Sequence, residues 1–281
     1  MNWDSNWLAP AKLNLFLHIV GRRADGYHLL QTVFRFIDLA DTLHFAPRDD
    51  GRIVLATPTP GVPPEQDLVV RAAEALKVGA GGTASCLGAT IHLDKHIPMG
   101  GGLGGGSSDA ATTLIALNQL WGCGLSRKRL QEIGLTLGAD VPIFIHGRNC
   151  FAEGVGECFT DVVVPEACYL LAIPPVHVPT ADIFRAPSLR RDTPAIRPAD
   201  WRSGMGHNDL ELVACALFPE VARHLAVLRR FGDARMTGSG ACCFVGFPTR
   251  TEAEAARQEL PPEMQAEVVG GLVVHPLLKS E

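Results

Sequence analysis

Apolar residues occupy every second position from Leu13 to Ile19, near the start of the chain. This period of two is typical of a β-strand that buries one face. Lys12 and Asn14 would then project together from the opposite, less apolar face. The pattern therefore predicts a strand that carries a cation and an amide on one side.

Other segments have helical periods or short apolar runs, and the two kinds follow each other in irregular order. Apolar residues spaced i, i+3, i+4 and i+7 around residues 69–76 predict a helix. A helix over Ser107–Leu120 would begin with Ser107 or Ser108 as its N-cap. The fold class that this order predicts is α+β. Further strands are predicted at residues 32–38 and near Ile53, Ile91, Cys150 and Tyr169, and further helices over Arg127–Leu137, near Asn208 and Glu220, and from Thr249.

Composition narrows the class of protein. The chain has 281 residues, of which 47% are hydrophobic and 20% charged, as expected for one large globular domain or two modest ones. Its formal net charge of −5 is spread without long runs, so the basic face that nucleic-acid binding needs is missing. The N-terminal segment lacks a signal-peptide pattern and no apolar run reaches the roughly 18 residues of a membrane span. We therefore expect a cytoplasmic protein.

The eight cysteines form no C-x-x-C pair and no ligand spacing with histidine. This arrangement argues against a zinc site and against a disulfide framework.

Glycine occupies six of the seven positions from Gly100 to Gly106, directly before a predicted helix. Successive N–H groups without Cβ atoms can approach one anion together, and the helix adds the positive end of its dipole. A flexible loop with an incidental glycine content is the alternative, but ordering six glycines costs more backbone entropy than ordering other residues. The run therefore predicts a phosphate-binding loop.

Three known kinds of phosphate loop differ from this run. A Walker loop ends in Gly-Lys-Ser or Gly-Lys-Thr, whereas two serines and no lysine follow here. Gly100, Gly102 and Gly105 match G-x-G-x-x-G, but no acidic residue follows where a dinucleotide fold binds the ribose. The H-R-D and D-F-G segments of protein kinases do not occur.

The run instead resembles the Pro-x-x-x-Gly-Leu-Gly-Ser-Ser loop of the galactokinase, homoserine kinase, mevalonate kinase and phosphomevalonate kinase (GHMP) superfamily. Residues 9–15 (APAKLNL) are similar to the first motif of the superfamily, and residues 236–243 (MTGSGACC) to its third. Residues 23–32, 138–142 and 207–211 are similar to one branch, whose members phosphorylate a cytidine-diphosphate-linked methylerythritol. The resemblance covers nearly the whole chain.

The resemblance implies a two-domain α+β fold, the GHMP-kinase fold, with the active site in the cleft between the domains. We place the ATP-binding and catalytic domain at residues 1–160 and the C-terminal domain at residues 161–281. The implied reaction transfers the γ-phosphoryl group of ATP to the 2-hydroxyl of the methylerythritol, in the non-mevalonate route to isoprenoids. Two other functions stay open: a sister kinase acting on homoserine or a mevalonate derivative, and a non-catalytic nucleotide sensor that retains the loop.

For the transfer step, the resemblance implies Lys12 and Asp140 as catalytic residues. Asp140 would accept the hydroxyl proton, and Lys12 beside it would keep the carboxylate ionised and stabilise charge on the transferred group. Without the resemblance, Asp140 fits equally well a turn or cap residue after Gly138, and Lys12 fits an exposed strand lysine.

For the substrate, the resemblance implies Tyr27 and Phe184 on the two faces of cytosine and His28 at its edge. Asn14 lies one strand repeat from Lys12 on the same side, where its amide would hold the substrate hydroxyl. Phe184 also fits an apolar position of a short helix, and Asn14 an exposed strand position. The residues implied for ATP are Pro98, Met99, Gly100, Gly101, Gly102, Leu103, Gly104, Gly105, Gly106, Ser107 and Ser108.

The carboxylate that helps to hold Mg²⁺ in some members of the superfamily has no clear counterpart in this chain. We therefore assign no protein metal ligand and expect Mg²⁺ to arrive with ATP. Ser107 and Ser108 are implied to lie near the ion and the β- and γ-phosphates, a role compatible with capping. The remaining partner is the small-molecule substrate; we expect a monomer or a homodimer that binds neither nucleic acid nor membrane.

Overall fold

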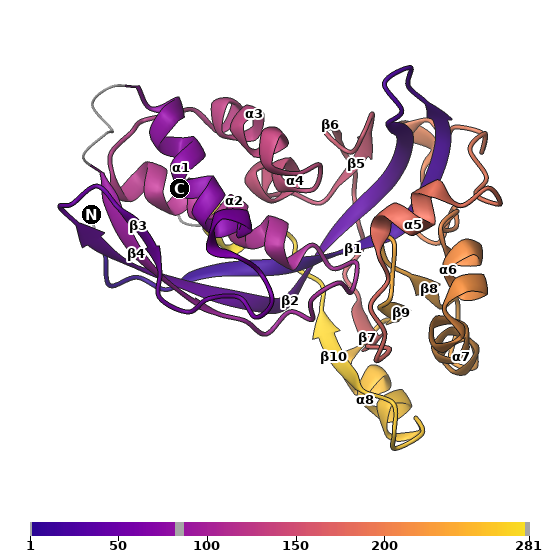
Figure 1. Cartoon of the computed structure of the whole chain (residues 1–281). Coiled ribbons are helices and arrows are strands. Elements are labelled where there is room, and N and C mark those ends of the chain that lie inside the picture. The colour runs from indigo at the N-terminus through magenta and orange to yellow at the C-terminus, as the bar shows by residue number, and fades with distance from the viewer. Residues whose placement is uncertain (1, 82–86, 279–281) are drawn as a thin grey trace.

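The computed structural model describes residues 2–81 and 87–278, and its described strands form two sheets (Figure 1). Among these residues, one sheet has six strands in the order β3-β4-β2-β5-β6 with β1 paired to β2, and the other has four in the order β10-β7-β9-β8. The mixture of sheets and helices confirms the predicted α+β class. The strands are β1 (Trp7–Arg22), β2 (His28–Arg48), β3 (Ile53–Leu55), β4 (Gly88–Asp94), β5 (Cys150–Glu153), β6 (Cys158–Asp161), β7 (Cys168–Ala172), β8 (Arg235–Met236), β9 (Cys243–Phe247) and β10 (Ala266–Gly270).

The helices divide between the two sheets, and each group buries an apolar face against its sheet (Figure 1). Ala72, Leu76 and Leu114 pack with the sheet residues Phe36 and Ile91 in the first core. The helices are α1 (Leu68–Gly79), α2 (Gly105–Leu120), α3 (Arg127–Leu137) and α4 (Val141–His146) in the first group, and α5 (Thr180–Arg185), α6 (Glu211–Leu217), α7 (Pro219–Leu228) and α8 (Arg250–Gln258) in the second.

Strand β1 is buried on both faces, which corrects the prediction of a strand with one buried face. Lys12 and Asn14 are only 2% and 3% exposed. Strand β1 passes from one half of the molecule to the other: Ala9 packs in the core under α1 and α2, whereas Leu17 and Ile19 pack in the core of the second sheet. A period in the sequence shows which side chains share a face, but it does not show what covers that face.

Helix α2 begins at Gly105, so the N-cap predicted at Ser107 or Ser108 is wrong. Gly104 occupies the N-cap position with a φ of 75°, a conformation that glycine adopts without strain. The Ser108 hydroxyl instead donates a hydrogen bond to the carbonyl oxygen of Pro10, 2.7 Å away. This bond ties the first turn of α2 to strand β1.

Two other predicted helices are confirmed, α3 with both of its ends and α8 with its start. Helix α3 covers residues 127–137 and ends at Gly138, as predicted. Helix α8 follows Thr249, whose hydroxyl accepts the N–H of Glu252 at 3.2 Å. These ends depend on hydrogen bonds between close neighbours in the chain, which a short sequence window contains.

The predicted domain boundary, between residues 160 and 161, falls inside β6 of the first sheet, shortly before β7 of the second. The C-terminal segment, however, returns to the first half. Leu272 and Leu277 pack on the first core, and the N–H of Leu272 donates to the carbonyl oxygen of Phe36 at 2.8 Å. The boundary stays a prediction, because segments of both halves cross it.

No helix in the described part of the chain combines the length and the apolar content needed to cross a lipid bilayer. The seven described cysteines are free thiols, and Cys86 lies outside the described residues. Burial raises the pKa of the Cys242 thiol to about 12, so this buried side chain stays protonated near neutral pH.

Candidate active site

A cleft of about 1330 Å³ is lined by segments from both halves of the fold. The first half contributes strand β1, the turn between β1 and β2 and the glycine run. The second half contributes α5 and the turn at residues 238–240. The cleft therefore lies between the two parts of the molecule, as predicted.

The glycine run forms a loop that lines the cleft and ends at the N-terminus of α2. The first hydrogen bond within the helix joins the N–H of Ser108 to the carbonyl oxygen of Gly104, at 2.9 Å. The N–H groups of Gly105, Gly106 and Ser107 therefore have no acceptor inside the helix. Together with the helix dipole, these groups form a site suited to a phosphate.

Close packing also requires glycine at two positions of the loop. Gly102 has a φ of 74°, and a Cβ atom there would lie 2.2 Å from the carbonyl oxygen of Thr237. A Cβ atom on Gly104 would lie 2.9 Å from Cζ of Phe144 and 3.1 Å from Cε of Lys12. The loop is thus tightly packed, in contrast to the flexible loop considered as an alternative.

Lys12 has three oxygen neighbours in the cleft. Its Nζ lies 2.6 Å from Oδ1 of Asn14, 3.1 Å from the carbonyl oxygen of Gly102 and 3.3 Å from Oδ2 of Asp140. An ammonium group has three N–H donors, and these contacts can use all of them. Lys12 therefore connects the glycine loop to the predicted base, and the alternative of an exposed strand lysine is wrong.

Asp140 directly precedes α4, but its side chain accepts no N–H group of that helix. The carboxylate instead pairs with Lys12, and 38% of the side chain stays exposed where it lines the cleft. The capping role considered from the sequence is therefore not the role that this carboxylate performs. A carboxylate in this position is available to a hydroxyl group bound in the cleft.

The Asn14 amide is held from both ends. Its Oδ1 accepts the hydrogen bond from Lys12, and its Nδ2 donates to Oγ1 of Thr32 at 2.9 Å. The backbone N–H of Asn14 donates to Oγ1 of Thr237 at 3.0 Å, which links β1 to the third sequence motif. The alternative of an exposed strand residue is wrong, and Asn14 holds Lys12 in place.

Tyr27, His28 and Phe184 all line one cleft, although Phe184 is far from the other two in the sequence. Tyr27 lies in the turn between β1 and β2 and is 63% exposed. The rings of His28 and Phe184 contact each other, with centroids 5.0 Å apart and planes tilted by 38°. Phe184 is half-buried in the short helix α5, so its packing role does not remove it from the cleft.

Two family models match the chain: the one described as GHMP kinases N terminal domain covers residues 67–148, and the one described as GHMP kinases C terminal covers residues 190–266. A 4-diphosphocytidyl-2-C-methyl-D-erythritol kinase of Dechloromonas aromatica is 64% identical over 97% of this chain and 99% of its own length. Another, of Thiobacillus denitrificans, is 60% identical over 96% of each chain. This chain belongs to the 4-diphosphocytidyl-2-C-methyl-D-erythritol kinase family of the GHMP kinases.

Solved structures agree with this family. A crystal structure of 4-(cytidine 5'-diphospho)-2C-methyl-D-erythritol kinase is 35% identical and superposes with a TM-score of 0.77, over 95% of this chain and 100% of its own. A mevalonate kinase at 14% identity has a TM-score of 0.69 over 97% of this chain, a likeness of fold alone. The predicted GHMP-kinase fold is confirmed, and the chain is a small-molecule kinase that uses ATP.

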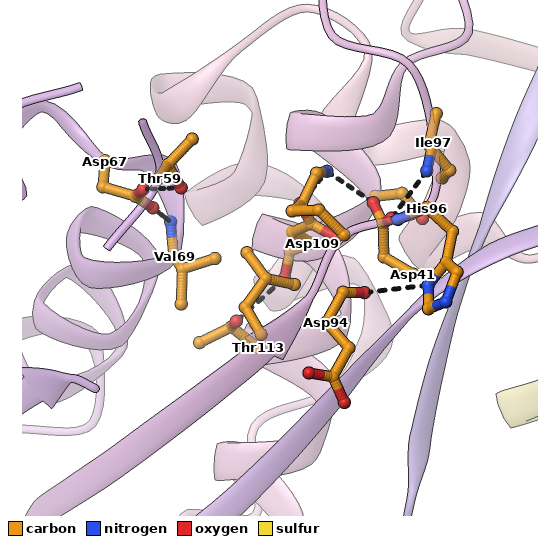
Figure 2. A network of polar contacts seen from close by, with 12 residues as sticks. Asp41, Thr59, Asp67, Val69, Asp94, His96, Ile97, Asp109 and Thr113 are labelled. Atoms are coloured by element: carbon orange, nitrogen blue, oxygen red, sulfur yellow. Dashed lines mark hydrogen bonds and ion pairs between the residues drawn. The ribbon is translucent and has the colours of Figure 1, made fainter. Parts of the chain in front are cut away.

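This GHMP kinase also has a buried charged cluster beside its glycine loop, which sequence patterns did not indicate. Lys95 lines the cleft and forms ion pairs with Asp41 and, at 2.8 Å, with Asp109. Asp41 accepts the N–H groups of His96 and Ile97, which precede the glycine run (Figure 2). The cluster therefore holds both the entry to the loop and the first turns of α2.

The cluster has one ammonium group for two buried carboxylates. Burial raises the pKa of Asp109 to about 8; Lys95 opposes this rise and the charge of Asp41 adds to it. Oδ1 of Asp109 has no hydrogen-bond partner among the described residues. Lys95 and Asp109 flank the glycine run, 14 residues apart, whereas Asp41 lies 54 residues before Lys95, so the fold brings the three together.

The residues around the loop fit a magnesium ion that arrives on the nucleotide. Within the described ranges, no group of three or more His, Cys, Asp or Glu side chains could hold a metal ion. Asp140 already pairs with Lys12, and Asp109 with Lys95. Ser107 lines the cleft with its half-buried side chain, whereas Ser108 is buried and bonded to β1. Mg²⁺ commonly keeps several waters and few protein ligands beside substrate phosphates, which suits this site.

Proposed function

We propose that this kinase transfers the γ-phosphoryl group of ATP to the 2-hydroxyl group of 4-diphosphocytidyl-2-C-methyl-D-erythritol, a step of the non-mevalonate route to isoprenoid precursors. The observation that carries the proposal is one cleft that holds a helix N-terminus whose first N–H groups have no acceptor inside the helix, the Lys12–Asp140 pair and an aromatic group. Relatives that are 60% and 64% identical bear the name of this kinase, which supports the choice of acceptor.

The proposed step begins with the triphosphate at the N-terminus of α2, where the N–H groups of Gly105, Gly106 and Ser107 meet phosphate oxygens. The substrate hydroxyl oxygen attacks the γ-phosphorus, the bond from that phosphorus to the β–γ bridging oxygen breaks, and ADP leaves. Asp140 accepts the hydroxyl proton. Ser107 would lie near a Mg²⁺ ion carried by the triphosphate, and that ion would supply positive charge to the phosphate oxygens.

Lys12 acts beside Asp140 in this proposal. Its positive charge stabilises the oxygens of the transferred group during transfer. Asn14 holds Lys12 by the 2.6 Å hydrogen bond and keeps one N–H of its amide for the substrate hydroxyl. Lys12, Asn14 and Asp140 act as one unit, because Asn14 and Asp140 both contact the ammonium group of Lys12.

The part of the cleft lined by Tyr27, His28 and Phe184, called the base end below, binds the cytosine ring in this proposal. Tyr27 and Phe184 stack on the two faces of the base, and His28 hydrogen-bonds to its edge. Homoserine and mevalonate have no flat ring on which these aromatic side chains could stack. A sensor that only binds a nucleotide would not need Asp140 as a proton acceptor. The two alternative functions are therefore not favoured.

The test is ADP release by the purified protein with ATP and Mg²⁺, measured with the cytidylated methylerythritol, homoserine, mevalonate or no acceptor. Release with the cytidylated substrate alone is the expected result. Release with another acceptor would keep the kinase and discard the cytosine site, and the absence of release with every acceptor would favour the sensor. A cytoplasmic location, a monomer or homodimer, and the absence of a nucleic-acid partner stay predictions.

A further inference from the structure

The guanidinium group of Arg191 contacts the ring of His28 at the base end of the cleft. Nε of Arg191 lies 3.0 Å from Nε2 of His28. Both side chains line the cleft. A guanidinium group has only donors, so Nε2 of His28 must be the acceptor in this hydrogen bond. The contact therefore determines which ring nitrogen of neutral His28 carries the proton.

Arg191 is held in this orientation by three backbone oxygens. Its Nη1 donates to the carbonyl of Leu189 at 2.9 Å, and its Nη2 donates to the carbonyls of Phe184 and Ala186, each at 3.0 Å. All three nitrogens of the planar group are thus engaged: Nη1 and Nη2 with carbonyl oxygens, which can only accept, and Nε with the ring nitrogen of His28. The group cannot rotate away from His28 without losing several hydrogen bonds.

The proton of neutral His28 consequently resides on Nδ1. Within the described chain, no group accepts a hydrogen bond from this nitrogen, and His28 lines the cleft. Burial lowers the pKa of His28, and the positive charges of Arg191 and Arg22 lower it further. The ring therefore stays neutral near pH 7, as an Nδ1–H donor with no partner in the protein.

We propose that Arg191 is a specificity-determining positioning residue: it fixes His28 as an Nδ1–H donor, which selects a pyrimidine with an acceptor at N3. Cytosine has a lone pair at N3, whereas uracil has an N–H there, so a uracil would place two donors against each other. This inference rests on the proposed function, in which His28 contacts the edge of the base.

The first test follows the protonation of the His28 ring by ¹⁵N nuclear magnetic resonance, since the shifts of the two ring nitrogens separate the protonated from the unprotonated one. His28→Gln identifies the signal among the ten histidines. We expect Nδ1 protonated in the wild type and a mixture of tautomers in Arg191→Met, which has a side chain of similar length and no donor. A wild-type proton on Nε2 would overturn the proposal, even if the variant did not fold.

The second test compares kcat/KM for the cytidylated substrate and for its uridine counterpart. In Arg191→Met, we expect the preference for cytidine to fall by roughly tenfold or more, through a higher KM for the cytidylated substrate with the KM for ATP unchanged. Arg190→Met is the matched control, because the neighbouring Arg190 side chain is exposed and pairs only with Asp192 among the described residues. An unchanged preference in Arg191→Met would overturn the proposal.

The two tests separate this inference from the proposed function. If the wild type phosphorylated neither pyrimidine substrate, the proposed function would be wrong, and the tautomer of His28 would still show whether Arg191 controls the ring. If the wild type used the cytidylated substrate and Arg191→Met kept both the tautomer and the preference, only the role of Arg191 would be wrong.

Discussion

The two ends of the cleft are built from different chemical groups. The phosphate end consists of the glycine loop, the first N–H groups of α2 and Lys12, which is 2% exposed. Glycine is needed at Gly102 and Gly104 because other atoms occupy the space that a side chain would fill. At the base end, the side chains proposed to bind cytosine lie on a turn and a short helix, and Tyr27 is 63% exposed. The phosphate end is therefore part of the packed fold, whereas the base end includes a side chain, Tyr27, that can change without disturbing the fold.

The largest expected effect is a loss of turnover at the phosphate end, without a change in the fold. Asp140→Asn removes the proton acceptor, so kcat should fall by roughly 10²- to 10⁴-fold. ATP should still bind, because the N–H groups of α2 and Lys12 remain. Steady-state ADP release and calorimetric titration with ATP measure the two quantities. Asp161→Asn, at a side chain that is 80% exposed, should leave both unchanged, and near-normal turnover in Asp140→Asn would remove Asp140 from the mechanism.

A second substitution tests whether the phosphate end belongs to the fold. Gly102→Ala places a Cβ atom against the carbonyl oxygen of Thr237 and should lower the free energy of unfolding by roughly 2–3 kcal/mol, with weaker ATP binding. Gly61→Ala is the matched control, since Gly61 has a nearly equal φ of 75° and no atom within 4 Å of the new Cβ. Urea unfolding measures both variants. Equal losses would mean that backbone conformation, and not packing, requires the glycine.

The third substitution tests the base end. Tyr27→Ala should raise the KM for the cytidylated substrate by roughly tenfold, because stacking of a base on an aromatic ring contributes about 1–3 kcal/mol. The free energy of unfolding and the KM for ATP should not change, since the side chain is largely exposed. Tyr27→Phe keeps the ring and should keep the KM. A loss of stability in Tyr27→Ala would contradict the contrast between the two ends.

The smallest expected effect is a pH dependence of stability from the cluster in Figure 2. Burial raises the pKa of Asp109 from 3.8 to about 8, so the folded state binds this proton more tightly than the unfolded state. The resulting stabilisation is complete below pH 4 and is lost as the pH rises to 8. Asp109→Asn should remove this fall in stability, because an amide does not titrate.

Urea unfolding at pH 5 and pH 8 measures this fall in stability for the wild type and for Asp109→Asn. Asp94→Asn is the control, because Asp94 lies near the cluster but its side chain is exposed (Figure 2). The same fall in stability in the wild type and in Asp109→Asn would show that another group causes it.

The sequence predicted those features that depend on near neighbours. The ends of α3, the Thr249 cap of α8 and the glycine loop before a helix are each contained in a short window, and the structure has them. The family resemblance identified Lys12 and Asp140, which the structure joins at 3.3 Å. The N-cap of α2 was wrong because a bond from Ser108 to Pro10, in a distant strand, uses the expected capping hydroxyl.

Periodicity, caps and motifs thus determined the α+β class, most of the helices and the phosphate loop, because each arises from contacts within a few residues of the chain. Only the tertiary structure decided that β1 is buried on both faces, that Lys95 holds two carboxylates and that Arg191 is bonded to His28. Burial and ion pairing depend on residues from distant segments, so their consequences for proton position and pKa follow from the fold and not from any local pattern.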